Sequence, residues 1–149
     1  MGKISASLED YLEVIYQLCR ERQVARVKEI AERLEVADAS VVGALRVLRR
    51  KRLVRQERYG YIRLTAEGEL LAREVFSRHE SLALFFREVL GLTDKAAEAE
   101  ACRAEHCLED RTIARLALLQ KFLGSRLKKR YRLAEVFSEY VRGKEMLNS

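Results

Sequence analysis

One stretch of the sequence constrains the fold more than any other feature. It consists of two amphipathic segments joined by a short turn, followed directly by two segments in which apolar and polar residues alternate. Residues 26–34 and 38–50 carry apolar side chains at helical spacing, and residues 35–37 separate them. Residues 53–64 alternate apolar and polar side chains around Tyr59-Gly60-Tyr61. This order predicts a helix-turn-helix followed by a β-hairpin, which is the winged-helix arrangement.

The rest of the chain predicts helices, because it has no proline and little glycine and is rich in good helix formers. Helical spacing of apolar residues recurs in residues 7–21, 66–90, 112–123 and 127–146. The expected N-caps are Ser7, Asp38, Thr65 and either Thr93 or Asp94. We therefore expect a mainly α fold, with an N-terminal winged helix-turn-helix domain (residues 1–72) followed by an all-helical domain (residues 73–149).

Charge is distributed unevenly along the chain. Residues 1–64 carry 14 Lys and Arg against 9 Asp and Glu, residues 65–110 carry 5 against 11, and residues 111–149 carry 10 against 3. The basic N-terminal segment indicates a polyanion partner, and the acidic central segment indicates a region that binds cations. Solvated helix faces of mixed sign explain the net charge of +6 but explain its segregation less well.

The predicted winged helix carries cations where they can hold phosphates on both sides of a DNA groove. Small residues occupy the outward positions near the start of its second helix, so direct base contacts there are limited. A merely solubilising basic surface is the alternative. The residues expected to contact double-stranded DNA are Arg26, Ala37, Ala39, Ser40, Gly43, Arg46, Arg49, Arg50, Lys51 and Arg58.

The acidic run of residues 98–110 contains a mixed set of potential metal ligands. If this run is helical, Glu98, Cys102, Glu105 and His106 fall on one stripe at i, i+4, i+7 and i+8. Carboxylate, thiolate and imidazole groups together suit a divalent transition metal better than a hydrophobic core. His79 is the only other histidine of the chain. Near the N-terminus, Asp10 and Glu13 are i, i+3 neighbours, a pattern that alone is usually solvated surface.

These motifs together resemble the DtxR/MntR family of metal-dependent transcriptional repressors. The resemblance rests on Ser7-Leu-Glu-Asp-Tyr-Leu-Glu-Val-Ile-Tyr16, the winged helix, Arg78-His79-Glu80 and Cys102-Arg-Ala-Glu105-His106, in this order. It extends from about Ser7 to Leu123 and implies the short, two-domain type without an SH3-like domain. It also implies a second domain for metal binding and dimerisation. The implied metal ligands are Asp10, Glu13, His79, Cys102, Glu105 and His106, with Glu98 as a further candidate.

The resemblance leaves the metal open. Asp10 and Glu13 match the manganese-responsive branch, which has Glu at the position of Cys102. The iron-responsive branch has Cys at that position, but it has Met at the position of Asp10 and Glu at that of Ala83. Thiolate favours Fe²⁺, Co²⁺ or Zn²⁺, whereas the carboxylates accept Mn²⁺. We expect one or two ions per subunit. We slightly favour Fe²⁺ over Mn²⁺ as the metal, and Co²⁺ and Zn²⁺ are possible in vitro.

The expected function is a repressor of metal homeostasis genes that binds operator DNA as a homodimer when loaded with Fe²⁺ or Mn²⁺. A winged-helix regulator switched by thiol oxidation at Cys102 or Cys107 is the alternative. A metalloenzyme and a purely architectural DNA-binding protein are weaker rivals, and we expect neither enzymatic activity nor a small-molecule substrate. No membrane span or signal peptide is predicted, so we expect a cytoplasmic protein without a membrane partner.

Overall fold

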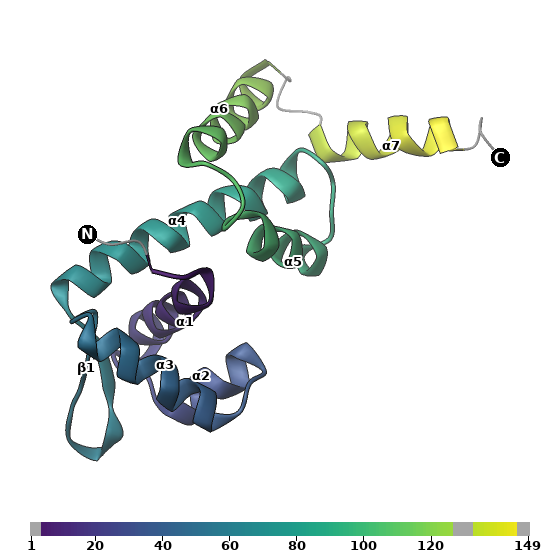
Figure 1. Ribbon diagram of the computed structural model, residues 1–149. Coiled ribbons are helices and arrows are strands. Elements are labelled where there is room, and N and C mark those ends of the chain that lie inside the picture. The colour runs from purple at the N-terminus through teal and green to yellow at the C-terminus, as the bar shows by residue number, and fades with distance from the viewer. Residues whose placement is uncertain (1–3, 127–132, 146–149) are drawn as a thin grey trace. The chain divides into compact units, whose positions relative to one another are not determined.

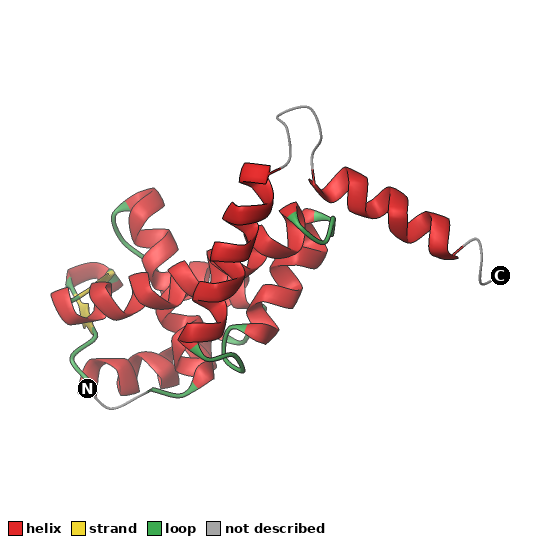
Figure 2. Ribbon diagram, turned by 90° about the horizontal axis from the view of Figure 1, so that it is seen from above, coloured by secondary structure: helices red, strands yellow, loops and turns green. Residues whose placement is uncertain are grey.

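The computed structural model describes residues 4–126 and 133–145, and the chain divides into two compact units between Phe76 and Ser77. Most of the described chain is helical, and two short strands form the β-structure that it contains (Figures 1 and 2). The predicted mainly α fold is therefore confirmed. No helix in the described ranges is long and apolar enough to cross a membrane.

The first unit contains the predicted helix-turn-helix and wing. Its elements are α1 (Ala6–Arg22), α2 (Val27–Leu34), α3 (Asp38–Arg50), β1 (Val54–Gln56), a 3-10 turn η1 (Arg58–Gly60) and β2 (Ile62–Leu64). The turn between α2 and α3 starts at Glu35, whose backbone is left-handed (φ 54°). The backbone N–H of Val36 then donates to the carbonyl of Ala31 at 3.0 Å. This bond closes α2 and leads the chain into α3.

The core of the first unit follows the apolar spacing of its three helices. The side chains of Leu12 and Ile15 on α1, Ile30 on α2, and Val41 and Leu48 on α3 have no exposed surface. Each recurs three, four or seven positions from another apolar residue of its helix, so each helix buries one stripe. The two strands close the same core.

The wing is an antiparallel hairpin that pairs Val54 with Leu64 and Gln56 with Ile62. At its tip Tyr59 (φ 63°) and Gly60 (φ 76°) both adopt left-handed backbone conformations. Glycine meets this requirement without a steric cost, which explains the glycine in the predicted turn. Ile62 also pairs with Ala25 just before α2, so the wing is attached to the start of the helix-turn-helix.

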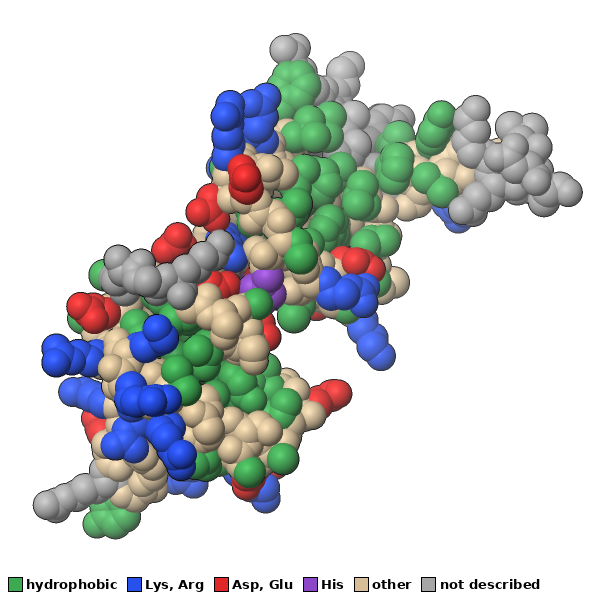
Figure 3. Space-filling view, in the orientation of Figure 1, with side chains coloured by type: hydrophobic (Ala, Val, Ile, Leu, Met, Phe, Trp, Pro, Cys, Tyr) green, Lys and Arg blue, Asp and Glu red, His purple; other side chains and the backbone are tan. Residues whose placement is uncertain are grey.

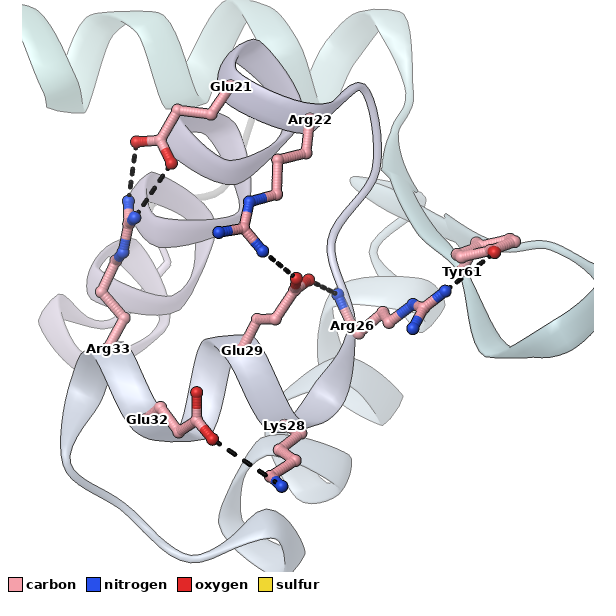
Figure 4. Close-up of polar contacts among 8 residues, drawn as sticks. All are labelled: Glu21, Arg22, Arg26, Lys28, Glu29, Glu32, Arg33 and Tyr61. Carbon is pink, nitrogen blue, oxygen red and sulfur yellow. Dashed lines mark hydrogen bonds and ion pairs between the residues drawn. The ribbon is translucent and has the colours of Figure 1, made fainter.

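Exposed polar contacts connect α1 and α2 (Figure 4). The guanidinium group of Arg33 donates to both carboxylate oxygens of Glu21 at 3.0 Å. This two-point contact lowers the pKa of Glu21 and raises that of Arg33. The carboxylate of Glu29 accepts from Arg22 at 2.7 Å and from the backbone N–H of Arg26 at 3.1 Å. The second bond satisfies an N–H at the start of α2 that would otherwise lack a helical partner.

The second unit is built from helices, and α4 begins in the first unit and ends in the second. The elements are α4 (Ala66–Glu88), α5 (Asp94–Ala104), α6 (Asp110–Arg126) and α7 (Leu133–Glu145). Helix α7 covers part of the predicted helix at residues 127–146, whose residues 127–132 and 146 lie outside the described ranges.

Two of the expected N-caps are found. The hydroxyl of Thr65 accepts from Gly68 N–H at 3.0 Å, and that of Thr93 accepts from Ala96 N–H at 3.3 Å. The other two positions were wrong by one or two residues. Helix α1 begins after Ser5 rather than Ser7, and Asp38 is the first residue of α3 rather than its cap.

The core of the second unit is small and uses small side chains. Leu82 and Ala83 of α4, Ala101 of α5 and Ile113 of α6 are buried together. The two alanines leave room for α4 and α5 to approach closely. Farther along α6, large apolar side chains are exposed instead, to 64% for Leu118, 44% for Leu119 and 53% for Phe122. The apolar stripe of α6 is therefore only partly used by its own unit.

Gly68 should be irreplaceable, because a Cβ atom there would lie 1.8 Å from the backbone oxygen of Leu53. We expect Gly68→Ala to lower the free energy of unfolding by about 1–3 kcal/mol, as overpacking does, in urea denaturation followed by circular dichroism. Gly124→Ala on α6 is the matched control, since its Cβ would meet no atom within 4 Å. Equal stability of the two variants would contradict the close approach.

Candidate functional site

The expected metal-ligand stripe is not a single helix, and this corrects the sequence interpretation. Helix α5 ends at Ala104, and Glu105 is its C-cap, so Glu105 and His106 lie in the turn before α6. The carbonyl oxygen of Glu105 accepts a hydrogen bond from the Arg78 guanidinium at 2.8 Å. This carbonyl would accept from residue 109 in a continued helix, so the bond to α4 takes the place of the next helical bond.

Glu105 is the centre of the candidate site. Its side chain has no exposed surface. Its Oε2 lies 3.3 Å from Nδ1 of His79, and its Oε1 lies 3.3 Å from Nε2 of His106. Neither oxygen accepts a hydrogen bond from the residues that the structure describes. A buried carboxylate without donors is costly, so the position calls for a positive charge.

The two 3.3 Å separations fit ligands of a shared cation better than ion pairs. Charge-assisted N–H···O bonds are shorter, about 2.7–2.9 Å. Ligand atoms bound at about 2.0–2.2 Å from a transition metal lie about 3.0 Å apart along an octahedral edge and about 3.4 Å apart along a tetrahedral edge. The nitrogen–oxygen separations at Glu105 fall in this range. The residues therefore fit a divalent transition metal.

Glu98 controls the orientation of the His79 ring. Nε2 of His79 lies 2.7 Å from a carboxylate oxygen of Glu98 on α5. Because an ionised carboxylate only accepts, Nε2 carries the proton in the neutral imidazole. Nδ1 then carries the lone pair and faces Glu105. A carboxylate that holds the far nitrogen of a histidine in this way is a frequent partner of histidine ligands in metal sites.

The remaining sulfur and carboxylate candidates are placed as follows. Cys102 on α5 is exposed, and its Sγ lies within 4.8 Å of a Glu105 oxygen, whereas Cys107 is exposed in the following turn. Ala83 is buried in the apolar core, and its methyl side chain has no ligand atom. The second unit thus brings together His79, Glu98, Cys102, Glu105 and His106.

Asp10 and Glu13 belong to α1 in the first unit. Glu13 is 6% exposed and accepts a hydrogen bond from the Gln17 side chain at 3.2 Å, and Asp10 is half-buried. Burial of Glu13 departs from the solvated surface that an i, i+3 carboxylate pair usually forms.

The expected DNA-contacting residues of α3 and the preceding turn are all solvent-exposed. The small residues Ala37, Ala39, Ser40 and Gly43 lie at the N-terminal end of α3, and the cations Arg46, Arg49, Arg50 and Lys51 lie toward its C-terminal end. Arg46, Arg49 and Arg50 line a shallow open groove. Lys and Arg side chains gather over the region of α3 and the wing (Figure 3).

Contacts with the wing orient two of these cations. The Arg26 guanidinium lies 4.9 Å from the centre of the Tyr61 ring and donates to its hydroxyl at 2.9 Å, as Figure 4 shows. Arg49 donates to the side-chain oxygen of Gln56 at 3.2 Å. Neither partner is acidic, so these contacts leave the positive charge of both arginines available to bind an anion. The side chain of Arg58 lies outside the described part of the chain.

Sequence reasoning missed three of these residues. The sequence pattern identifies Tyr61 and Gln56 only as positions of the predicted hairpin, and Arg78 only as a neighbour of His79. The alternation of apolar and polar residues along the hairpin predicts which side chains point outward. It does not predict which arginine each of them contacts. No local signal marks Arg78, because its partner lies 27 positions away.

Comparison with known proteins decides the family. A model described as the iron-dependent repressor N-terminal DNA-binding domain matches residues 3–62. A model described as the iron-dependent repressor metal-binding and dimerisation domain matches residues 65–126. The chain belongs to the DtxR/MntR family of metal-dependent transcriptional repressors. Both matched segments agree with the fold. The first covers the helix-turn-helix and most of the wing, and the second covers the Glu105 cluster, that is, Glu105 with His79, Glu98, Cys102 and His106.

Similar curated proteins cover most of the chain. An uncharacterised HTH-type transcriptional regulator of Methanocaldococcus jannaschii is 36% identical over 80% of this chain and 97% of its own length. The HTH-type transcriptional regulator MntR of Bacillus subtilis is 33% identical over 78% of this chain and 81% of its own.

A solved structure extends the comparison. A manganese-dependent transcriptional repressor in complex with manganese is 30% identical, with a TM-score of 0.69 over 77% of this chain. This chain spans about half the length (53%) of that structure. The family consists of transcriptional repressors rather than enzymes. The comparisons give no support to the thiol-oxidation alternative at Cys102 or Cys107.

The three thiols should differ in reactivity. Cys19 is half-buried and donates to the carbonyl oxygen of Ile62 at 3.7 Å, and burial raises the pKa of its thiol. Because the thiolate is the reactive form, we expect iodoacetamide to modify exposed Cys102 and Cys107 of the metal-free protein well before Cys19. Peptide mass spectrometry measures the three rates. Alkylation of Cys19 as fast as that of Cys107 would contradict this assignment, and denatured protein provides the reference in which all three react.

Proposed function

We propose that this chain is a repressor that binds operator DNA as a homodimer when a divalent transition metal, Fe²⁺ or Mn²⁺, occupies the Glu105 cluster. The observation that carries the proposal is the buried carboxylate of Glu105 flanked by two imidazoles at 3.3 Å. Family membership supports the link between this cluster and the control of transcription. Metal homeostasis genes are the proposed targets.

The proposed ligands are His79, Cys102, Glu105 and His106, completed by Asp10 and Glu13. Glu98 supports the set by holding His79, and it remains the candidate for a further ligand. A bound divalent cation supplies the positive charge that the buried carboxylate otherwise lacks. The ligand types accommodate one or two ions per subunit. A thiolate among carboxylates favours Fe²⁺ slightly over Mn²⁺, and Co²⁺ or Zn²⁺ should bind in vitro.

The chain's own residues couple the cluster to DNA binding. Asp10 and Glu13 are on α1, the helix whose buried face packs against α2 and α3. Recruiting these two carboxylates selects one arrangement of the DNA-binding unit, and DNA in turn favours the metal-bound form. In a homodimer, the selected arrangement must match DNA half-sites about one helical turn, roughly 34 Å, apart. Without a cation, the carboxylates repel one another and this selection is lost.

The exposed end of α6 is the proposed surface for homodimer formation. Leu118, Leu119 and Phe122 expose large apolar side chains there, beside the small apolar core of the same unit. Monomeric proteins rarely expose such clusters without a binding role. The match to a metal-binding and dimerisation domain supports this assignment.

DNA affinity should rest on phosphate contacts, because the outward residues at the start of α3 are small and offer no bidentate base contact. Arg26, Arg46, Arg49, Arg50, Lys51 and Arg58 are the proposed phosphate contacts. Ala37, Ala39, Ser40 and Gly43 are then the residues that approach the base edges, where methyl contacts, water and DNA shape share recognition.

Metal titration is the direct test of the proposed function. Under anaerobic conditions, we expect Fe²⁺, Mn²⁺ and Co²⁺ to increase affinity for DNA selected from the source genome, and a chelator to reverse the increase. Metal should also slow alkylation of Cys102 while leaving Cys107, the internal control, unchanged. Glu105→Gln should abolish both effects. DNA binding that is indifferent to chelator would overturn the proposal in favour of an architectural protein.

Phosphate binding by α3 can be tested through salt dependence. Arg46→Ala or Arg50→Ala should weaken binding to all DNA sequences and reduce the slope of log affinity against log salt by about 0.9 for each phosphate that is no longer neutralised. Arg33→Ala is a matched control, because Arg33 is paired with Glu21 on α1. Fluorescence anisotropy over a salt series measures both quantities. An unchanged slope would remove the substituted arginine from the set of phosphate-binding residues.

A further inference from the structure

We infer that Arg78 is a positioning residue for the metal cluster, acting on the peptide that joins Glu105 to His106; this inference rests on the proposed function. Its guanidinium donates to the carbonyl oxygen of Glu105 at 2.8 Å. The same side chain lies 3.8 Å from a carboxylate oxygen of Asp110, the first residue of α6. Arg78 therefore links α4 to both ends of the turn that carries the ligands.

The position of the hydrogen bond explains how a residue without a ligand atom can act on two ligands. A peptide unit is planar, and the unit that contains the Glu105 carbonyl also contains the Cα atoms of Glu105 and His106. Fixing this carbonyl therefore fixes the orientation of the peptide plane and restrains the positions of the two Cα atoms from which both side chains depart. His79, the next residue of α4, faces the carboxylate of Glu105 at the same time. Helix α4 thus bonds the backbone of Glu105 and presents a second potential ligand, His79, to its side chain.

The chemistry of this position suits arginine. The side chain of Arg78 is only 17% exposed, so its hydrogen bond to the backbone is shielded from water. Its planar group has several donors in fixed directions and can bond the carbonyl while facing Asp110. Lysine offers a similar charge from a single flexible point and cannot reproduce this geometry. The guanidinium group of Arg78 also lies on the backbone side of the cluster, so it does not occupy the position of a metal ligand.

Metal affinity of purified full-length variants tests this role, with Co²⁺ as the probe. We expect Arg78→Gln to weaken Co²⁺ binding by about ten- to a hundredfold, as loss of an outer partner of a metal site does. The visible absorption spectrum of bound Co²⁺ should change shape, because the two ligands depart in altered directions. Arg78→Lys, which keeps the charge, should recover only part of the affinity and is the second variant if Arg78→Gln does not fold.

Arg87→Gln is the matched control, since Arg87 lies on the same helix but contacts Glu88 and Asp94 instead of the cluster. It should bind Co²⁺ with wild-type affinity and spectrum. Wild-type affinity and spectrum in the Arg78 variants, full recovery by lysine, or an equal loss in Arg87→Gln would each overturn the inference. Failure of the wild-type protein to bind Co²⁺ would instead overturn the proposed function, so the two failures are distinguishable.

Discussion

The second unit is organised around the interaction of one buried carboxylate, Glu105, with the two histidines of the chain. In the described residues no hydrogen bond reaches this carboxylate, so its burial leaves a negative charge that a bound cation would balance. The apolar core beside it is small and built largely from Leu82, Ala83, Ala101 and Ile113. A unit with so little buried apolar area depends more strongly on its polar centre than a larger core would.

The first unit shows the opposite balance. Its helices bury large side chains without exposed surface, among them Leu12, Ile15 and Leu48, and its polar contacts are mostly exposed. Those exposed contacts do not set its stability, but they do orient charge. The stacking of Arg26 on Tyr61 is the clearest case, because it holds a cation at the junction of the wing and α2. Buried apolar residues and exposed, oriented cations are thus different residues of one small unit.

Sequence alone predicted the features that local physics determines. The helix-turn-helix, the wing and the caps at Thr65 and Thr93 follow from apolar spacing, glycine conformation and side-chain capping. The end of α5 did not follow, because residues 98–110 contain neither proline nor glycine and the stop depends on Arg78 of another helix. The contact of Glu98 with His79 was also missed, because it joins two different helices. Residue types predicted the chemistry of the site, whereas its arrangement required contacts between distant positions.

The buried charge of Glu105 has a consequence for the life of the protein in the cell. If a cation balances this charge, its removal leaves the charge uncompensated, and the turn between α5 and α6 should then open more readily to proteases. Cation binding would favour the closed turn by mass action and so reduce cleavage. Under the proposed function, metal supply would then affect the turnover of the protein as well as its affinity for operators.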